Sequence, residues 1–128
     1  MKSVVICGSR RFKAEVKKFA QELQKLGVDV YAPHHHSGQD EWETFSKEYQ
    51  AFIALGLTHD HFYKIRMADA VFVYNKGGYS GPSTTLEIGF AVALGKSIYA
   101  LAADDELCRH TLFREVVGMP TELVKRLR

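Results

Sequence analysis

Short apolar runs alternate with amphipathic segments along the chain. Residues 3–7 form a β-branched run of the kind found in buried parallel strands, and three similar runs follow. Between these runs, apolar residues recur every three or four positions, as in helices packed by one face. The pattern predicts strands at residues 3–7, 28–31, 70–74 and 97–102. It predicts helices at 12–26, 42–52, 59–67 and 84–94, and one or two more within 107–127.

Glycines mark several expected ends of these elements. Gly27 and Gly95 each follow a helical pattern in the place of a C-terminal capping glycine. Gly56 is expected to separate the helix at 59–67 from an aromatic helix before it. The stripe of that aromatic helix consists of Trp42, Phe45, Tyr49 and Phe52, which could serve a subunit interface or ordinary core.

The alternation of strands and helices predicts an α/β fold, a parallel sheet with helices on both faces. The length of 128 residues fits one domain, residues 1–128. We expect a small flavodoxin- or Rossmann-like three-layer sandwich with four or five strands. In such folds the ligand lies beyond the carboxyl ends of the strands. This rule directs attention to the loops at residues 8–11 and 75–83.

Composition and charge narrow the function classes. The hydrophobic fraction is 46%, and the net charge of +2 is too small to indicate a nucleic-acid polymer or a membrane surface as partner. No apolar stretch is long enough for a membrane span. The N-terminus enters a strand pattern directly, without a visible signal peptide. With Cys7 and Cys108 expected as free thiols, a cytoplasmic protein is the default expectation.

The glycine-rich segment before the helix at 84–94 is a candidate ligand loop. Glycines let backbone N–H groups approach a ligand, and helix N-termini favour anions. The functional interpretation is a cradle for phosphate or ribose, and the structural one is a flexible connection with an ordinary serine cap. The candidate binding residues are Tyr79, Ser80, Gly81 and Ser83.

The turn after the first strand is a second, weaker candidate. Gly8 and Ser9 could hold a phosphate, with Arg10 or Arg11 supplying positive charge. The alternative is a solvated turn in which Ser9 caps the following helix.

Glu87 is the most informative residue, because it is the only charged residue in an apolar helical segment. Burying a carboxylate without a partner is costly. A capping glutamate belongs at the third helical position, and Glu87 lies deeper. Either it pairs with a buried Arg or Lys, or it is a catalytic or sugar-binding carboxylate facing the glycine-rich loop.

The histidines carry weaker signals. His34, His35 and His36 are adjacent and lack a second ligand cluster, so we expect no metal site and no cofactor. Asp60 could cap a helix or serve the site, and His61 could point toward the strand ends. Cys7 ends a buried strand and is expected to be core.

Three blocks of the chain carry a resemblance: residues 6–9, residues 68–73, and residues 77–91 followed by Gly95 and Lys96. They resemble the nucleoside 2-deoxyribosyltransferase-like superfamily, which includes the 2′-deoxynucleoside 5′-phosphate N-hydrolases and the hydroxymethyl-CMP hydrolases. The likeness spans roughly residues 4–101. It implies an enzyme that cleaves an N-glycosidic bond.

The resemblance also implies roles for individual residues. The family's nucleophile matches Glu87, and its glycosyl-enzyme intermediate is released to water or to another base, as in retaining glycosidases. A nucleoside or its 5′-monophosphate is the implied substrate, with the phosphate held by Gly8, Ser9, Ser80 and Ser83, and Gly81 shaping the loop. A homodimer or larger assembly is the implied oligomeric state.

Two positions depart from the family's pattern. Family members often carry a tyrosine in the first strand that supports the nucleophile, where this chain has Val5. They also carry an aspartate that binds sugar hydroxyls and assists the leaving base. An ungapped count puts His61 there, with Asp60 one residue away; a histidine can also act in acid–base chemistry.

Two other functions remain open alongside the N-glycosidase. One is a non-catalytic nucleotide-binding sensor that uses the same pocket. The other is a phosphoribohydrolase of the cytokinin-activating type, although the loop lacks the Pro-Gly-Gly-x-Gly-Thr pattern of those enzymes.

Overall fold

The fold is built on a five-stranded parallel sheet in the order β2-β1-β3-β4-β5. The computed structural model describes residues 1–33 and 39–128, and only the backbone of residues 39 and 40. His34, His35 and His36 lie outside the described residues. The strands are β1 (Val4–Gly8), β2 (Val30–Tyr31), β3 (Ala70–Tyr74), β4 (Ser97–Ala100) and β5 (Glu115–Val116).

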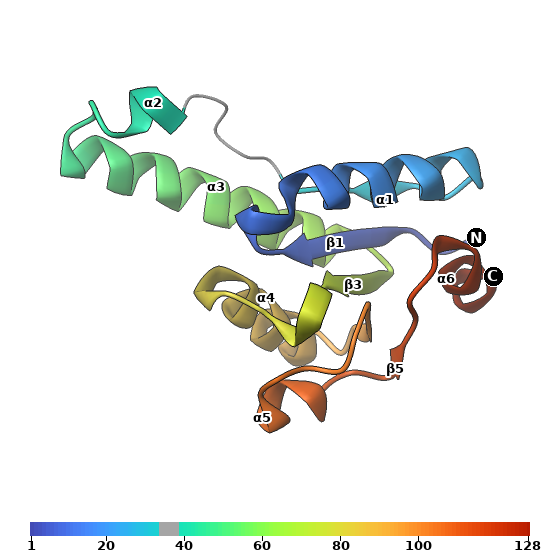
Figure 1. Cartoon of the computed structure of the whole chain (residues 1–128). Helices are drawn as coiled ribbons and strands as arrows, with labels where there is room; N and C mark the ends of the chain where they lie inside the picture. The colour runs from blue at the N-terminus through green and yellow to red at the C-terminus, as the bar shows by residue number, and fades with distance from the viewer. Residues whose placement is uncertain (34–38) are drawn as a thin grey trace.

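Helices cover both faces of the sheet, because successive strand residues point to opposite sides. On one face, Val4 and Ile6 of β1 pack with α1 (Lys13–Lys25) and α6 (Pro120–Leu127). On the other face, Val5 and Cys7 pack with α3 (Lys47–Met67) and α4 (Pro82–Ala93). Figure 1 shows α1 and α4 on opposite sides of β1 and β3. The expected three-layer α/β sandwich is confirmed.

The remaining helical segments are short. They are η1 (Arg10–Phe12), α2 (Gln39–Trp42), η2 (Lys76–Gly78) and α5 (Leu107–His110). In the described residues, no helix combines the length and apolar character needed to cross a membrane.

The expected break at Gly56 is wrong, because α3 runs without interruption for 21 residues. Ser46 caps this helix by accepting a hydrogen bond from the backbone N–H of Tyr49. A Cβ placed on Gly56 would meet nothing within 4 Å, so this glycine is not required by packing. Glycine destabilises a helix interior by about 1 kcal/mol relative to alanine, and the other residues of this long helix compensate for that loss.

One further expectation about helices needs correction. The aromatic stripe does not lie on one helix, because Trp42 ends α2 and Phe45 precedes α3. Its last two members, Tyr49 and Phe52, are exposed on α3, so they are not core. The segment 107–127 holds two helices, α5 and α6, as expected, and the two-residue strand β5 lies between them.

Polar contacts fix the ends of β3. Asp69, just before β3, accepts hydrogen bonds from the backbone N–H and the hydroxyl of Ser3. Asn75, just after β3, is fully buried and pairs through its amide with both backbone groups of Ala102. Lys96 donates to the carbonyl of Ala68 at the end of α3. These contacts hold β3 in register beneath the candidate site.

Candidate active site

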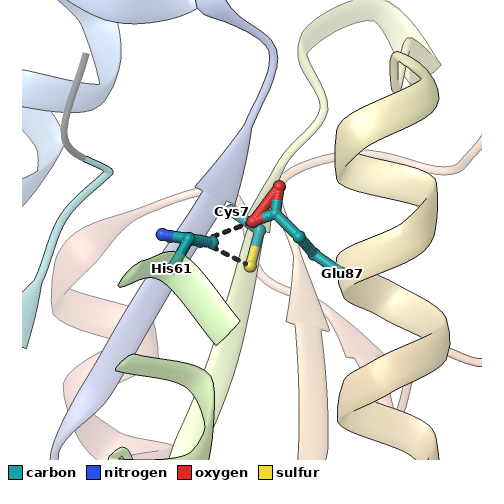
Figure 2. Close-up of side chains that lie close together, drawn as sticks. All are labelled: Cys7, His61 and Glu87. Atoms are coloured by element: carbon teal, nitrogen blue, oxygen red, sulfur yellow. Dashed lines mark hydrogen bonds and ion pairs between the residues drawn. The ribbon is translucent and has the colours of Figure 1, made fainter. Parts of the chain in front are cut away.

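Three elements bring Cys7, His61 and Glu87 together near the carboxyl ends of the strands (Figure 2). Cys7 comes from β1, His61 from α3 and Glu87 from α4. The Nε2 atom of His61 lies 2.6 Å from Oε2 of Glu87 and 3.4 Å from Sγ of Cys7. The side chains of His61 and Glu87 are only 9% and 12% exposed. The lone carboxylate of the apolar helix therefore has a buried histidine as its partner.

The hydrogen bonding of this pair is incomplete. Oε2 of Glu87 is close to His61, but no hydrogen bond of good geometry reaches it from the described residues. Nδ1 of His61 is also buried without a hydrogen-bond partner among them, and Figure 2 shows it pointing away from Glu87. Buried polar atoms in native proteins are normally paired. The pair therefore holds two buried polar atoms, one on each side chain, without a hydrogen-bond partner among the described residues.

Cys7 is a neutral thiol in this setting. Burial raises its pKa well above the usual value, and the negative charge and hydrogen bonding of Glu87 raise it further. Its side chain is fully buried, as the sequence predicted, but it is not simply core. Its place beside Glu87 follows from strand alternation, which turns Cys7 toward α3 and α4.

A cavity of about 370 Å³ opens above the pair, within the size range of small-molecule sites. His61 and Glu87 line it. Most of the other lining residues form two groups. One is polar or glycine and comes from the two strand-end loops: Gly8, Ser9, Arg10, Tyr79, Gly81, Ser83 and Thr84. The other is mainly apolar: Pro33, Trp42, Ala54, Leu57, Phe62 and Leu86.

The polar end of the cavity has the features of an anion site. A Cβ on Gly81 would lie 3.5 Å from the hydroxyl of Tyr79 and 3.9 Å from that of Ser9, so both hydroxyls face the same open space. Gly81 is also the N-cap of α4, whose first backbone N–H groups have no helical acceptor. The guanidinium of Arg11 stacks on the Tyr79 ring at 3.8 Å from its centroid. Arg10 lines the same cavity and adds positive charge. Hydroxyls, a helix N-terminus and positive charge all favour a phosphate here.

A sequence profile of the nucleoside 2-deoxyribosyltransferase family matches residues 6–123. The chain belongs to this family. The match includes every residue of the cavity's two polar loops, and it makes the protein a member of an enzyme family, as the resemblance implied. No curated protein matches the sequence.

Solved structures support the fold of the family. The chain is similar to a 2-deoxyribosyltransferase from Bacillus psychrosaccharolyticus, with a TM-score of 0.62 and 18% identity over 94% of this chain and 89% of that one. It is similar to a CMP N-glycosidase from Clostridium botulinum, with a TM-score of 0.52 and 21% identity over 98% of both chains. A conserved protein from Enterococcus faecalis has a TM-score of 0.55 and 16% identity, over 99% of this chain and 97% of that one.

Most of the site residues expected from the sequence line the cavity: Gly8, Ser9, Arg10, His61, Tyr79, Gly81, Ser83 and Glu87. Ser9 also caps η1 through the backbone N–H of Arg11, so capping and lining coexist. Glu87 is no cap, because α4 begins at Pro82. Its partner is His61 rather than a buried Arg or Lys.

Two expected residues do not line the cavity. Asp60 is 46% exposed and pairs with Lys64 one turn along α3, at 2.9 Å. Ser80 is buried, and its hydroxyl has no hydrogen-bond partner among the described residues. Of the departures from the family pattern, Val5 is fully buried in the core two residues before Cys7. The neighbours of the carboxylate are thus His61 and Cys7.

Sequence reasoning missed the apolar wall of the cavity and the position of Cys7. The sequence pattern places Trp42 and Phe62 in helices and indicates no ligand role for either. Phe62 packs against α4 by stacking on Phe90, a tertiary contact that the sequence does not signal.

Proposed function

We propose that this protein cleaves the N-glycosidic bond of a nucleoside 5′-monophosphate, with the carboxylate of Glu87 as nucleophile. The observation that carries the proposal is a desolvated, histidine-paired carboxylate in the same cavity as a two-hydroxyl anion site. The family membership and the similarity to a CMP N-glycosidase support the same reaction class.

The substrate fits the cavity in one orientation. The 5′-phosphate binds at the polar end, where Ser9 and Tyr79 donate hydroxyl hydrogen bonds beside the N-terminus of α4. The base packs against the apolar wall, which includes Trp42 and Phe62. The sugar then lies between them, with its anomeric carbon over Glu87.

The first step is displacement of the base. An oxygen of Glu87 bonds to the anomeric carbon as the bond from that carbon to the base nitrogen breaks. The leaving base takes a proton from the imidazolium of His61, which lines the same cavity. Glu87 becomes a glycosyl ester, His61 becomes neutral, and the base leaves uncharged.

The second step regenerates the enzyme. The oxygen of a water molecule attacks the anomeric carbon, and the ester bond between that carbon and Glu87 breaks. Neutral His61 accepts the proton that the water molecule loses. The products are the free sugar phosphate, a carboxylate and a protonated histidine. If a second base enters in place of water, the same step gives base transfer. Neither step needs a cofactor.

The test is a panel of nucleosides and their 5′-monophosphates, with free base measured by chromatography. We expect base release from monophosphates in preference to nucleosides. Glu87→Gln keeps the size of the side chain and should lower the rate at least about 100-fold while ligand affinity changes little. Asp29→Asn, an exposed carboxylate just before β2, is the matched control. Tight binding by wild type without any base release would contradict the proposal and favour a nucleotide sensor.

We also propose that the protein forms a homodimer through the outer surface of α3 and α4. The apolar pattern at 84–94 predicts a helix buried on all sides. The structure instead exposes large apolar side chains on both helices, among them Phe52 at 70% and Leu86 at 63%. The N-terminal half of α3 extends past the sheet with α2 at its tip (Figure 1). Exposed apolar patches of this kind mark interaction sites. Light scattering should give a dimer mass that Phe52→Glu reduces to a monomer, and a wild-type monomer would refute this.

A further inference from the structure

The three side chains at the base of the cavity have a property that the glycosidase reaction does not use. The ligand-forming atoms of Cys7, His61 and Glu87 all lie within 4.8 Å of one another. They come from three different elements of a packed core, so the fold fixes their positions. A thiol, an imidazole and a carboxylate are all side-chain types that bind transition metals.

The donor types match Zn²⁺ better than a hard cation. Zn²⁺ binds thiolate sulfur at about 2.3 Å, imidazole nitrogen at about 2.0 Å and carboxylate oxygen at about 2.1 Å. A tetrahedron with these bond lengths separates its donor atoms by about 3.4 Å. The Sγ–Nε2 distance of 3.4 Å between Cys7 and His61 already meets this requirement.

The contact between His61 and Glu87 must open to admit the ion. Their atoms are 2.6 Å apart, so one side chain must shift by roughly 0.8 Å to reach the tetrahedral spacing. The shift gives up the 2.6 Å contact between His61 and Glu87, and coordination of both groups by the ion replaces it. His61 and Glu87 both line the cavity, which gives the ion a route in and leaves a fourth position for water.

We propose that Cys7, His61 and Glu87 form a binding site for Zn²⁺, and that the bound ion inhibits base release. Binding converts the thiol of Cys7 to a thiolate and releases its proton to solvent. The ion occupies the carboxylate oxygen that would attack the sugar. The site itself stands on the geometry alone, whereas the inhibition rests on the proposed function.

Metal binding is measured first, without reference to activity. The 128-residue chain, freed of metal with a chelator, is titrated with Zn²⁺ by calorimetry and with Co²⁺ by absorption spectroscopy. We expect one ion per chain and a thiolate-to-cobalt charge-transfer band. Cys7→Ala should abolish the band and weaken Zn²⁺ binding at least about tenfold. Glu87→Gln should also weaken Zn²⁺ binding, and it provides a second variant of near-equal volume if Cys7→Ala fails to fold.

Two controls separate this site from other metal-binding groups in the chain. Cys108→Ala removes the exposed thiol and should leave the band intact. Replacing His34, His35 and His36 together by glutamine tests the histidine tract and should also leave it intact. A band that survives Cys7→Ala, or one that disappears with Cys108→Ala or the histidine replacement, would overturn the proposal, as would the absence of binding to folded wild type.

Inhibition is measured next, as the ratio of the base-release rates with and without Zn²⁺. Wild type should lose base release on adding Zn²⁺ and recover it with a chelator, and Cys7→Ala should be at least about tenfold less sensitive. Equal sensitivity of both proteins would overturn the inhibitory role. If wild type releases no base from any substrate, the proposed function fails while the cobalt spectrum still decides the metal site.

Discussion

Gly78, directly before Tyr79 in the glycine-rich loop, gives a quantitative test of the contacts that fix the loop's conformation. Its backbone has φ of +85°, a left-handed conformation that side chains disfavour. A Cβ there would lie 2.5 Å from Oδ1 of Asp105 and 2.9 Å from the carbonyl oxygen of Ala103. The exposed Asp105 side chain can swing away, but the backbone carbonyl of Ala103 cannot move without disturbing the loop.

Gly77 is the matched control, because it shares the backbone problem without the crowding. Its φ is +68°, and a Cβ there would meet nothing within 4 Å. Left-handed backbone costs about 1–2 kcal/mol for alanine at either position. Overpacking adds about 1–3 kcal/mol at Gly78 alone. We expect Gly77→Ala to lower the free energy of unfolding by about 1 kcal/mol, and Gly78→Ala by about 3 kcal/mol.

Urea unfolding followed by far-UV circular dichroism measures both variants against wild type. The dependence of the unfolding free energy on urea concentration should stay the same in both variants. The urea concentration at the unfolding midpoint should fall, and it should fall further for Gly78→Ala than for Gly77→Ala. Equal destabilisation of the two variants would show that crowding around Gly78 contributes nothing. If Gly78→Ala were as stable as wild type, neither the left-handed backbone nor the crowding at this position would cost stability, and the prediction would be refuted.

Three further predictions follow from the site and its supports. With a chelator present, a thiol reagent should modify Cys108 at once and Cys7 only on unfolding, because burial protects Cys7 and raises its pKa; fast reaction of both thiols would contradict this. Hydrogen bonds from the backbone and then the hydroxyl of Ser3 lower the pKa of Asp69, so its carboxylate stabilises the fold above the unfolded pKa and loses this effect as pH falls. The urea midpoint of wild type should therefore exceed that of Asp69→Asn at neutral pH, and the two midpoints should converge below about pH 4. A difference that does not change with pH would refute this role of the Asp69 carboxylate. Calorimetry should show that Ser9→Ala and Tyr79→Phe each lower the affinity for a nucleoside 5′-monophosphate about tenfold and change the affinity for the nucleoside little. Equal losses of affinity for both ligands would exclude a phosphate site.

The sequence predicts the sheet and the place of the site because both depend on strong local signals. Apolar runs of five residues specify β1 and β3, and parallel strands bring their following loops to one edge. Glu87 stands out because a single charge in an apolar helix needs a partner. His61 was reached through the family pattern, and the structure brings it to 2.6 Å from Glu87.

Other features depend on tertiary contacts that no local pattern carries. The continuity of α3 through Gly56 depends on the whole helix, which outweighs one poor helix former. The role of Cys7 depends on what lies opposite the strand, and the exposure of Leu86 depends on which face of α4 meets the sheet. The strand β5 has only two residues, too few for a periodic signal.

The central claim is that Glu87 forms a covalent bond with the sugar. Trypsin should release residues 77–96 as one peptide, because no lysine or arginine lies between Lys76 and Lys96, and Glu87 is its only acidic residue. Acid-quenched turnover of a cleaved nucleotide, followed by digestion and mass spectrometry, should show this peptide heavier by one sugar phosphate unit in wild type and unchanged in Glu87→Gln. A sugar adduct on any other peptide, or base release by Glu87→Gln at the wild-type rate, would contradict the account.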